Sequence, residues 1–392
     1  MIRKKISTLV LCISLVGASL SFGPTASASP VNSNAVNAQD ASLTQVDKSE
    51  ISSSINEVLS LSSDVLKNGK AKDYSNIVKD PELLELLNKQ SKFDVEWFKK
   101  FDGKIDNYKS NVTITRVTQT AIDTYAVDVL YDVEFKLYGA EKVSKSKGEK
   151  YRFEVKYEDG KYYITKKLDL DEDTDASVKQ QSNDKESLKS EDTYFPDYDS
   201  VIDSKIKVID DKSNNIDRYY EYFTQINSEA DNSNIRLNSY SGYNAGSAVS
   251  YAERYAESPN YSQYPGSKGY FDEGKDCTDF VSQCAYAGGV PASSYWYAYS
   301  APWINVVAFR DYMVSNGYTS ESSWTDGARV GDIVQFYNPQ KSEWAHSVIL
   351  TGNLQGVKWF FCGHSKQRLD YPLYDAYAEN GYTNMRTLEF WH

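Results

Sequence analysis

The stretch GKDCTDFVSQCAYAGG, residues 274–289, places a cysteine directly after an aspartate, where an apolar periodic run begins. Apolar residues at helical spacing and a terminating glycine pair follow it: Phe280, Val281, Cys284, Ala285 and Gly288-Gly289. This pattern predicts a helix with Asp276 as its cap and Cys277 in its first turn. Unpaired amides and the helix dipole lower the pKa of a thiol at such a position, so Cys277 is a candidate nucleophile.

The same stretch also allows a purely structural interpretation, because small buried cysteines are common in core helices. Cys284 follows seven residues later on the apolar face of the predicted helix, where the dipole gives no help. We therefore predict that Cys284 is structural, and the position of Cys277 alone leaves both interpretations open.

A nucleophilic cysteine needs a base, and the sequence contains three histidines, His346, His364 and the terminal His392. The pattern predicts strands at residues 331–336 and 345–351 and a third strand within residues 357–368. If these strands are antiparallel neighbours packed on the cysteine helix, His346 and His364 are cross-strand partners. The arrangement predicts Cys277 as nucleophile, His346 as base and His364 as the group that orients the base. Two alternatives stay open. Both histidines and Cys277 could form a zinc site, although the sequence contains no HExxH or CxxC motif. The histidines could also be ordinary core residues.

The beginning of the sequence and its charge bear on the compartment and on the partners. Residues 1–28 follow the charged, apolar, small-residue order of a secretory signal peptide, and no later run offers the roughly 20 apolar residues of a membrane span. We therefore expect a secreted protein, extracellular or associated with the cell wall. The net charge of -12 argues against nucleic acid as a partner. No cofactor or metal is expected.

Residues 45–170 have a different pattern from the cysteine region. Two predicted helices, the second capped by Asp80 with Pro81 following, precede alternating strands and a hairpin that turns at Asp159-Gly160. This order resembles the cystatin-like cone-roll domains of secreted bacterial proteins, and we expect an accessory α+β domain. Residues 171–239 are acidic and polar and predict a linker, with a possible short helix at IDRYYEYFTQI.

Four blocks in the C-terminal part carry a resemblance to a known family: YNAGSAVSYAERYA, DCTDFVSQCAYAGG, RVGDIVQFYN with WAHSVILTG, and FFCGHSKQR. They resemble the amidase domain of secreted Gram-positive proteins, a relative of the papain-like NlpC and CHAP hydrolases, over about residues 240–392. The resemblance implies a papain-like α+β fold with Cys277 as nucleophile, His346 as base and His364 at the third polar position.

The expected chemistry is hydrolysis of an amide, with peptide or peptidoglycan as substrate, through a thioester on Cys277. For the oxyanion and the substrate, the candidates are the Cys277 backbone amide, Tyr270, Asp276 and Trp303, although Trp303 also fits a buried anchor. An acyltransferase of the same architecture and an inert extracellular binding module remain alternatives.

Overall fold

The computed structural model describes residues 45–171, 194–224, 242–324, 328–339, 341–356, 358–379 and 381–390. The expected signal peptide, the terminal His392, residues 172–193 and 225–239 of the expected linker, and residues 240–241 lie outside this part of the chain. Residues 38–392 form one compact unit.

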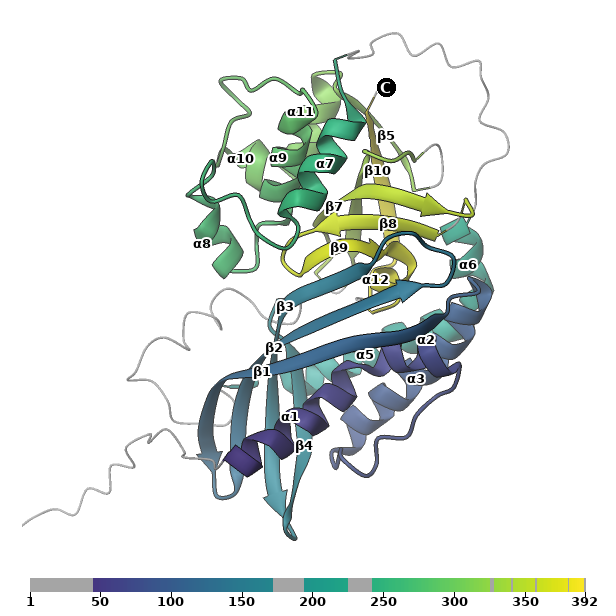
Figure 1. The fold of residues 1–392 in the computed structure, drawn as a ribbon, viewed down its shortest axis with the longest axis vertical. Coiled ribbons are helices and arrows are strands. Elements are labelled where there is room, and N and C mark those ends of the chain that lie inside the picture. Colours follow the sequence, from purple (N-terminus) through teal and green to yellow (C-terminus); the bar gives the residue numbers. More distant parts are fainter. Residues whose placement is uncertain are drawn as a thin grey trace, which may run out of the picture. The chain divides into compact units, whose positions relative to one another are not determined.

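Within the described residues, ten strands form one sheet in the order β1-β2-β3-β9-β8-β7-β6-β10-β5, with β4 paired to β3, and neighbouring strands are antiparallel (Figure 1). The strands are β1 (Ile105–Ala121), β2 (Thr124–Leu137), β3 (Ser144–Glu158), β4 (Lys161–Asp169), β5 (Thr319–Ser323), β6 (Ile333–Asn338), β7 (Glu343–Leu354), β8 (Lys358–Gly363), β9 (Gln367–Pro372) and β10 (Asn384–Phe390).

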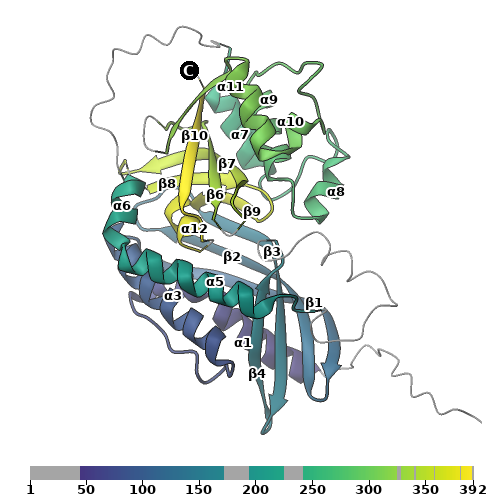
Figure 2. The same ribbon diagram turned by 180° about the vertical axis from the view of Figure 1, so that it is seen from behind.

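The helices of the first half cover strands β1 to β4. They are α1 (Gln45–Leu59), α2 (Leu61–Asn68), α3 (Pro81–Lys100), α5 (Tyr198–Asn214) and α6 (Ile216–Thr224). Helices α1 and α2 pack on β1, and α5 packs on α3 (Figure 2). Two local predictions are confirmed: Asp80 caps α3 by accepting from the Leu83 amide at 2.7 Å, and the hairpin turns at Asp159-Gly160 with both residues at positive φ.

Strand β3 joins the two halves of the sheet. Its Ser146 pairs with Arg368 of β9 on one side and with Val133 of β2 on the other, while the part of β3 from Tyr151 onward pairs with β2 and β4. The junction holds a buried set of ion pairs, in which the Lys366 ammonium lies 2.8 Å from Asp169 and 3.9 Å from Glu149. The roll strands and the strands that follow residue 240 thus share one sheet; the division into separately folding domains stays a prediction.

Helices α5 and α6 lie inside the segment that the sequence predicted as a polar linker. Helix α6 is the short helix expected at IDRYYEYFTQI, but α5 was not expected. In α5, Ile202 and Ile209 are buried, and the buried Lys212 donates to the Tyr377 carbonyl at 2.5 Å. The linker interpretation is therefore wrong for residues 198–224, because these helices pack against α3 and the C-terminal part of the chain.

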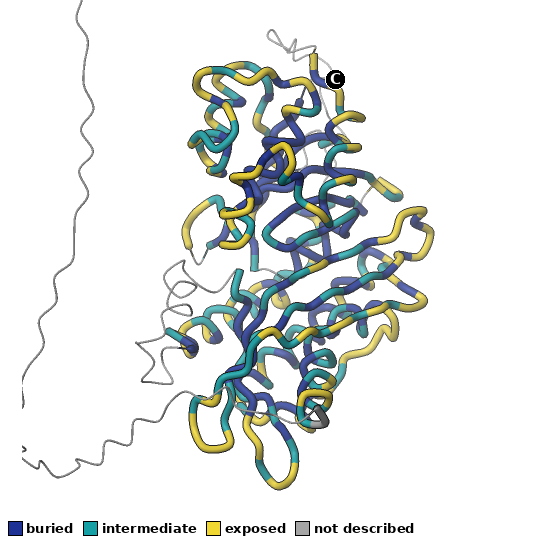
Figure 3. The backbone as a smooth tube through the Cα atoms, turned by 60° about the vertical axis from the view of Figure 1, so that its left-hand side comes forward, coloured by how far each residue is buried: buried dark blue, intermediate teal, exposed yellow. Residues whose placement is uncertain are grey.

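The second half places helices α7 (Ala245–Tyr255), α8 (Ser267–Asp272), α9 (Cys277–Ala287), α10 (Ala301–Ile304) and α11 (Val306–Ser315) beside strands β5 to β10, and α12 (Leu373–Glu379) follows β9 (Figures 1 and 2). In this half, a core forms between α9 and the sheet; it includes Phe280, Cys284, Ile349 and Cys362. Exposed residues gather at turns and loops, whereas the strands are mostly buried or half-buried (Figure 3).

The fold is mixed α and β with an antiparallel sheet, as expected for the α+β class. No described helix combines the length and the apolar composition that a membrane-spanning helix needs.

Candidate active site

Cys277 is the first residue of α9, as predicted, and its sulfur lies against strand β7. Its side chain is buried, with 6% of the residue exposed. The sulfur interacts with the Thr278 hydroxyl at 3.7 Å, and backbone hydrogen bonds from Ser347 and Thr278 also reach it. Because Ser347 is the residue after His346, the sulfur lies next to the part of β7 that carries the predicted base.

The thiol of Cys277 has a pKa raised to about 11, chiefly because burial disfavours the thiolate. The Ser347 amide and the Thr278 hydroxyl oppose this by donating to the sulfur, whereas the negative charge of Asp276 raises the pKa further. The expectation of a lowered pKa at the helix start is therefore wrong for this structure: desolvation outweighs the donors. The resting sulfur is a thiol at neutral pH.

Asp276 occupies the N-cap position of α9, as predicted, but its carboxylate does not cap the helix amides. One carboxylate oxygen lies 2.7 Å from His364 Nδ1, and the other accepts from the Ser365 amide at 3.1 Å. No side-chain hydrogen bond caps α9 at Asp276. The Asp276 side chain thus leaves the first amides of α9 uncapped, and the Thr278 amide is directed at the Cys277 sulfur.

His364 is buried and held at both ring nitrogens. Nε2 lies 3.0 Å from the Tyr255 carbonyl, and the ring stacks on Phe280 with centroids 3.9 Å apart. The Asp276 carboxylate and the Tyr255 carbonyl thus engage both ring nitrogens of His364. Neither nitrogen is directed at the Cys277 sulfur.

His346 lies opposite Phe336 across the β6–β7 ladder, next to a register shift between the Phe336 and Tyr337 pairs. Its half-buried ring lies near Phe336 and Tyr382, with centroids 6.0 and 6.4 Å away, and none of the described residues forms a hydrogen bond with it. The nitrogens of His346 are therefore not committed to another protein group. Register shifts of this kind re-aim side chains and recur beside active sites.

Burial lowers the pKa of His346 to about 3, and the positive charges of Arg368 and Lys366 add to this effect. Asp276 acts in the opposite direction, which places its carboxylate within electrostatic reach of the His346 ring. The imidazole is consequently neutral at pH 7, as a general base must be, and the same carboxylate contacts His364 and influences His346.

The predicted contact between the two histidines is not formed in the described structure. Strand β8 ends at Gly363, and Ser365 adopts a left-handed conformation with φ of 76°, so the chain leaves the sheet before His364 can stand opposite His346. His364 turns toward α9 and Asp276 instead.

The structure also locates the two aromatic candidates. Tyr270 in α8 is half-buried and stacks on Tyr299 at 6.2 Å, and no described hydrogen bond joins it to Cys277. Trp303 is 2% exposed and donates from Nε1 to Asp279 at 2.5 Å. Trp303 is therefore a buried anchor of α9, and its assignment as a substrate-contacting residue is wrong.

Sequence reasoning missed a buried polar chain beneath the cysteine. Thr278 and Ser347 bring their hydroxyls to 3.4 Å, and the Gln335 amide donates to Ser347 at 3.2 Å. Arg386 donates to Gln335 at 2.8 Å, so the chain runs from α9 through β7 and β6 to β10. The sequence feature that could have revealed this polar chain is Gln335, a polar residue in a mostly apolar predicted strand.

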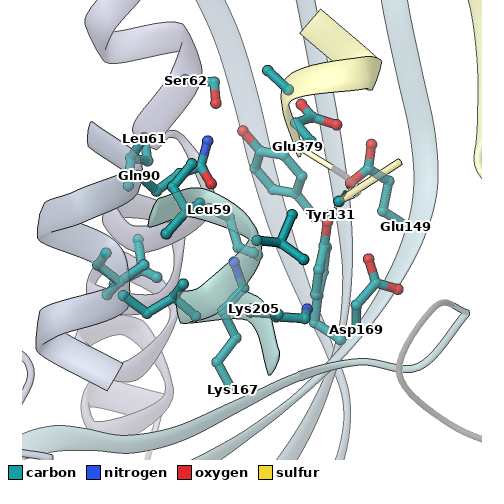
Figure 4. A pocket seen from close by; sticks show the side chains of 18 of the residues that line it. Leu59, Leu61, Ser62, Gln90, Tyr131, Glu149, Lys167, Asp169, Lys205 and Glu379 are labelled. Carbon is teal, nitrogen blue, oxygen red and sulfur yellow. Dashed lines mark hydrogen bonds between the residues drawn. The ribbon is translucent and has the colours of Figure 1, made fainter. Parts of the chain in front are cut away.

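A cavity of about 150 Å³ lies elsewhere, between the roll helices and the ion pairs of the β3–β9 junction. Figure 4 shows Leu59, Leu61 and Gln90 on its helical side and Glu149 and Asp169 on its strand side. Among its lining residues, Lys366 is paired with Glu149 and Asp169, and Cys277 does not line the cavity. This cavity is separate from the candidate active site.

The fold and the cysteine geometry can now be set beside known proteins. Residues 242–387 match the model of a family described as "Putative amidase domain". The matched segment contains Cys277, His346 and His364, and the match indicates amide hydrolysis as its general chemistry.

Among curated proteins, the chain is 31% identical over 159 residues to "Uncharacterized protein YjcM" of Bacillus subtilis (strain 168). The alignment covers 38% of this chain and 37% of that relative, so the chain spans well under half of the relative's length. No solved structure matches the chain.

Proposed function

We propose that the protein is a secreted, cysteine-dependent amide hydrolase that acts on peptide bonds of the bacterial cell wall. The observation that carries this proposal is the position of the Cys277 sulfur, at the uncapped start of α9 and against the backbone amide of Ser347. The amidase-family match over residues 242–387 supports the reaction class. The order of features in residues 1–28 supports secretion.

The proposed reaction begins with Cys277 as a thiol. His346 takes the sulfur proton while sulfur attacks the amide carbonyl, and the first amides of α9 stabilise the oxyanion. The protonated imidazole then gives its proton to the leaving amine as the carbon–nitrogen bond breaks. Water, with His346 again as base, releases the acid from the thioester. In this structure His346 packs on Phe336 and Tyr382, so its ring must turn toward the sulfur when substrate binds.

His364 and Asp276 have a positioning role in this proposal. Their ion pair holds the residue before the nucleophile, keeps the carboxylate away from the first turn of α9, and places a negative charge within reach of the imidazolium that forms on His346. This role differs from the direct contact between histidines that the sequence predicted. Neither residue transfers a proton in the proposed reaction.

The test uses the full mature chain and purified peptidoglycan, with new amines and acids identified by mass spectrometry. The wild type should release a defined amine, Cys277→Ala should release none, and Cys284→Ala, a matched control in the same helix, should keep activity. Activity that survives Cys277→Ala would overturn the cysteine mechanism. A product joined to an added amine rather than to water would identify an acyltransferase. Retention of residues 1–28 on protein recovered from a Gram-positive host would contradict secretion.

A further inference from the structure

The loop between α9 and α10 exposes aromatic side chains in an uncharged part of the chain. Residues 280–309 contain no charged residue, although charged residues make up 25% of the chain. Three tyrosines in this part are exposed, Tyr295 by 76%, Tyr297 by 53% and Tyr286 by 43%. Exposed apolar groups gathered in one region usually mark a binding surface.

The buried Trp296 anchors the loop segment that carries the two most exposed tyrosines, Tyr295 and Tyr297. It is fully buried, and its ring lies 4.7 Å from that of Trp303 and stacks on Tyr312 at 6.0 Å. Since Trp296 points into the core, its two neighbours Tyr295 and Tyr297 project away from it. The Trp296–Trp303 pair also reaches Tyr286, whose ring lies 6.2 Å from Trp303.

Short hydrogen bonds close the loop on both sides of Trp296. The Ser293 hydroxyl accepts from the Tyr295 and Trp296 amides at 3.1 and 3.0 Å, and the Ser300 hydroxyl accepts from the Tyr297 amide at 3.2 Å. Exposed rings on such a fixed backbone lose little conformational freedom when a ligand packs on them.

The loop is tied to the segment that leads to the nucleophile. Tyr299, at φ of 72°, accepts from the Gly266 amide at 2.9 Å, and a Cβ at Gly266 would stand 2.7 Å from the Tyr299 ring. Tyr299 also stacks on Tyr270 of α8. Tyr286 lies on α9 itself, nine positions after Cys277, or roughly 13 Å along the helix axis. Nine residues also turn the helix by a net of about 180°, so Tyr286 and Cys277 lie on opposite faces of α9 and a substrate that reaches both must curve around the helix.

We propose that Tyr286, Tyr295 and Tyr297 form a platform for the uncharged sugar backbone of the cell-wall glycan, and that the attached peptide reaches Cys277. Tyrosine offers a flat ring for the carbon–hydrogen face of a sugar and a hydroxyl for its oxygens. The lack of charged residues over 280–309 suits an uncharged polymer, whereas the net charge of -12 disfavours anionic wall polymers elsewhere on the chain. This inference deepens the proposed function and rests on it for the identity of the substrate.

The test measures binding of a soluble N-acetylglucosamine tetramer to the full chain carrying Cys277→Ala, by calorimetry or by tryptophan and tyrosine fluorescence. Binding should weaken about tenfold or more when Tyr295→Ser and Tyr297→Ser are combined. Tyr138→Ser, which removes a tyrosine 71% exposed in the turn after β2, should leave affinity unchanged. Tyr297→Phe keeps the ring and should keep most of the affinity, which separates a lost contact from a misfolded loop.

Equal tetramer affinity in the platform variant and its parent, or no tetramer binding by the parent, would overturn the platform. If the chain instead self-associates through these tyrosines and binds no sugar, the surface is an interface with a second copy of the chain. That result would also overturn the platform proposal. Failure of the cysteine chemistry is a separate result, because Cys277→Ala is present throughout. If the chain binds the sugar but the wild type hydrolyses no amide, the platform proposal is supported and the proposed hydrolase reaction is contradicted.

Discussion

His364 Nδ1 and the carboxylate of Asp276 lie 2.7 Å apart, although 88 positions separate the two residues in the sequence. The pair ties the turn after β8 to the residue in front of the nucleophile. It leaves His346 as the internal histidine whose ring nitrogens have no described hydrogen bond, and it gives the two histidines different expected effects on catalysis.

His346→Ala should reduce kcat/KM for amide hydrolysis by at least about 1,000-fold, because it removes the proposed proton acceptor and donor together. His364→Ala should cost less, about 10- to 100-fold, because it releases Asp276 without removing the base. Steady-state kinetics on one peptide substrate check both values. His364→Asn or His364→Gln should recover part of the loss, since either amide can donate to Asp276. A His364→Ala defect as deep as that of His346→Ala would reverse the assignment.

Alkylation of Cys277 by iodoacetamide should be slow at pH 6 and should rise about tenfold per pH unit toward pH 10, because only the thiolate reacts and the pKa is raised to about 11. Peptide mass spectrometry after timed labelling gives the rate for each cysteine. Cys284 and Cys362, both fully buried, serve as internal controls and should label more slowly. Rapid labelling of Cys277 at pH 6 would show that its resting form is a thiolate.

The stability of the wild type should fall more steeply between pH 7 and pH 5 than that of His346→Gln. The folded imidazole, with a pKa of about 3, stays neutral in this range, whereas the unfolded imidazole binds a proton near its ordinary value of 6.5. Proton uptake therefore favours the unfolded chain, by up to about 2 kcal/mol at pH 5. Denaturant unfolding of both proteins at the two pH values measures the difference. Parallel stability curves would mean that His346 titrates normally.

Lys366→Met should lower the free energy of unfolding by about 3–5 kcal/mol, because it leaves the buried Asp169 and Glu149 carboxylates short of a cation. Lys268→Met offers a matched control, since its ion pair with Asp272 is exposed and should contribute less than about 1 kcal/mol. Denaturant unfolding checks both variants. An equally small effect of the two substitutions would show that the β3–β9 junction does not depend on its ion pairs.

A fragment of residues 240–392 should be less stable than the full chain and should associate through β9. Removing the preceding residues exposes the edge of β9 that pairs with β3 and deletes the Trp97 indole that donates to the Tyr374 carbonyl at 2.9 Å. Thermal unfolding and sedimentation of the fragment and the full chain give the comparison. A monomeric fragment of full stability would establish the independent domain that the sequence predicted.

The sequence predicted those parts of the fold that depend on neighbouring residues. Asp80 as a cap, the turn at Asp159-Gly160 and the start of α9 at Cys277 all follow from patterns a few residues long. Helix α5 was missed because its acidic composition hid a buried stripe that includes Ile202 and Ile209. Spacing between those residues, rather than composition, was the available signal.

The relations that the sequence could not give are contacts between distant residues. Pairing of Ser146 with Arg368 joins two strands far apart in the sequence, and no local pattern marks either strand as the other's partner. Alternation through Phe360 and Cys362 correctly indicated a strand, but it extended the strand to His364 and missed the turn at Ser365. Asp276 was read as a cap because a local rule cannot detect a partner 88 positions away that binds the same carboxylate.

The shared sheet limits how this chain can change by insertion, deletion or exchange of modules. Gly148, at φ of 65°, separates the part of β3 that pairs with β9 from the part that pairs with β4. One residue added before Gly148 would shift the register with β2 and β9, while one added after it would shift the register with β2 and β4. Transfer of residues 242–387 to another protein would leave the edge of β9 unpaired unless a strand with the register of β3 accompanies them.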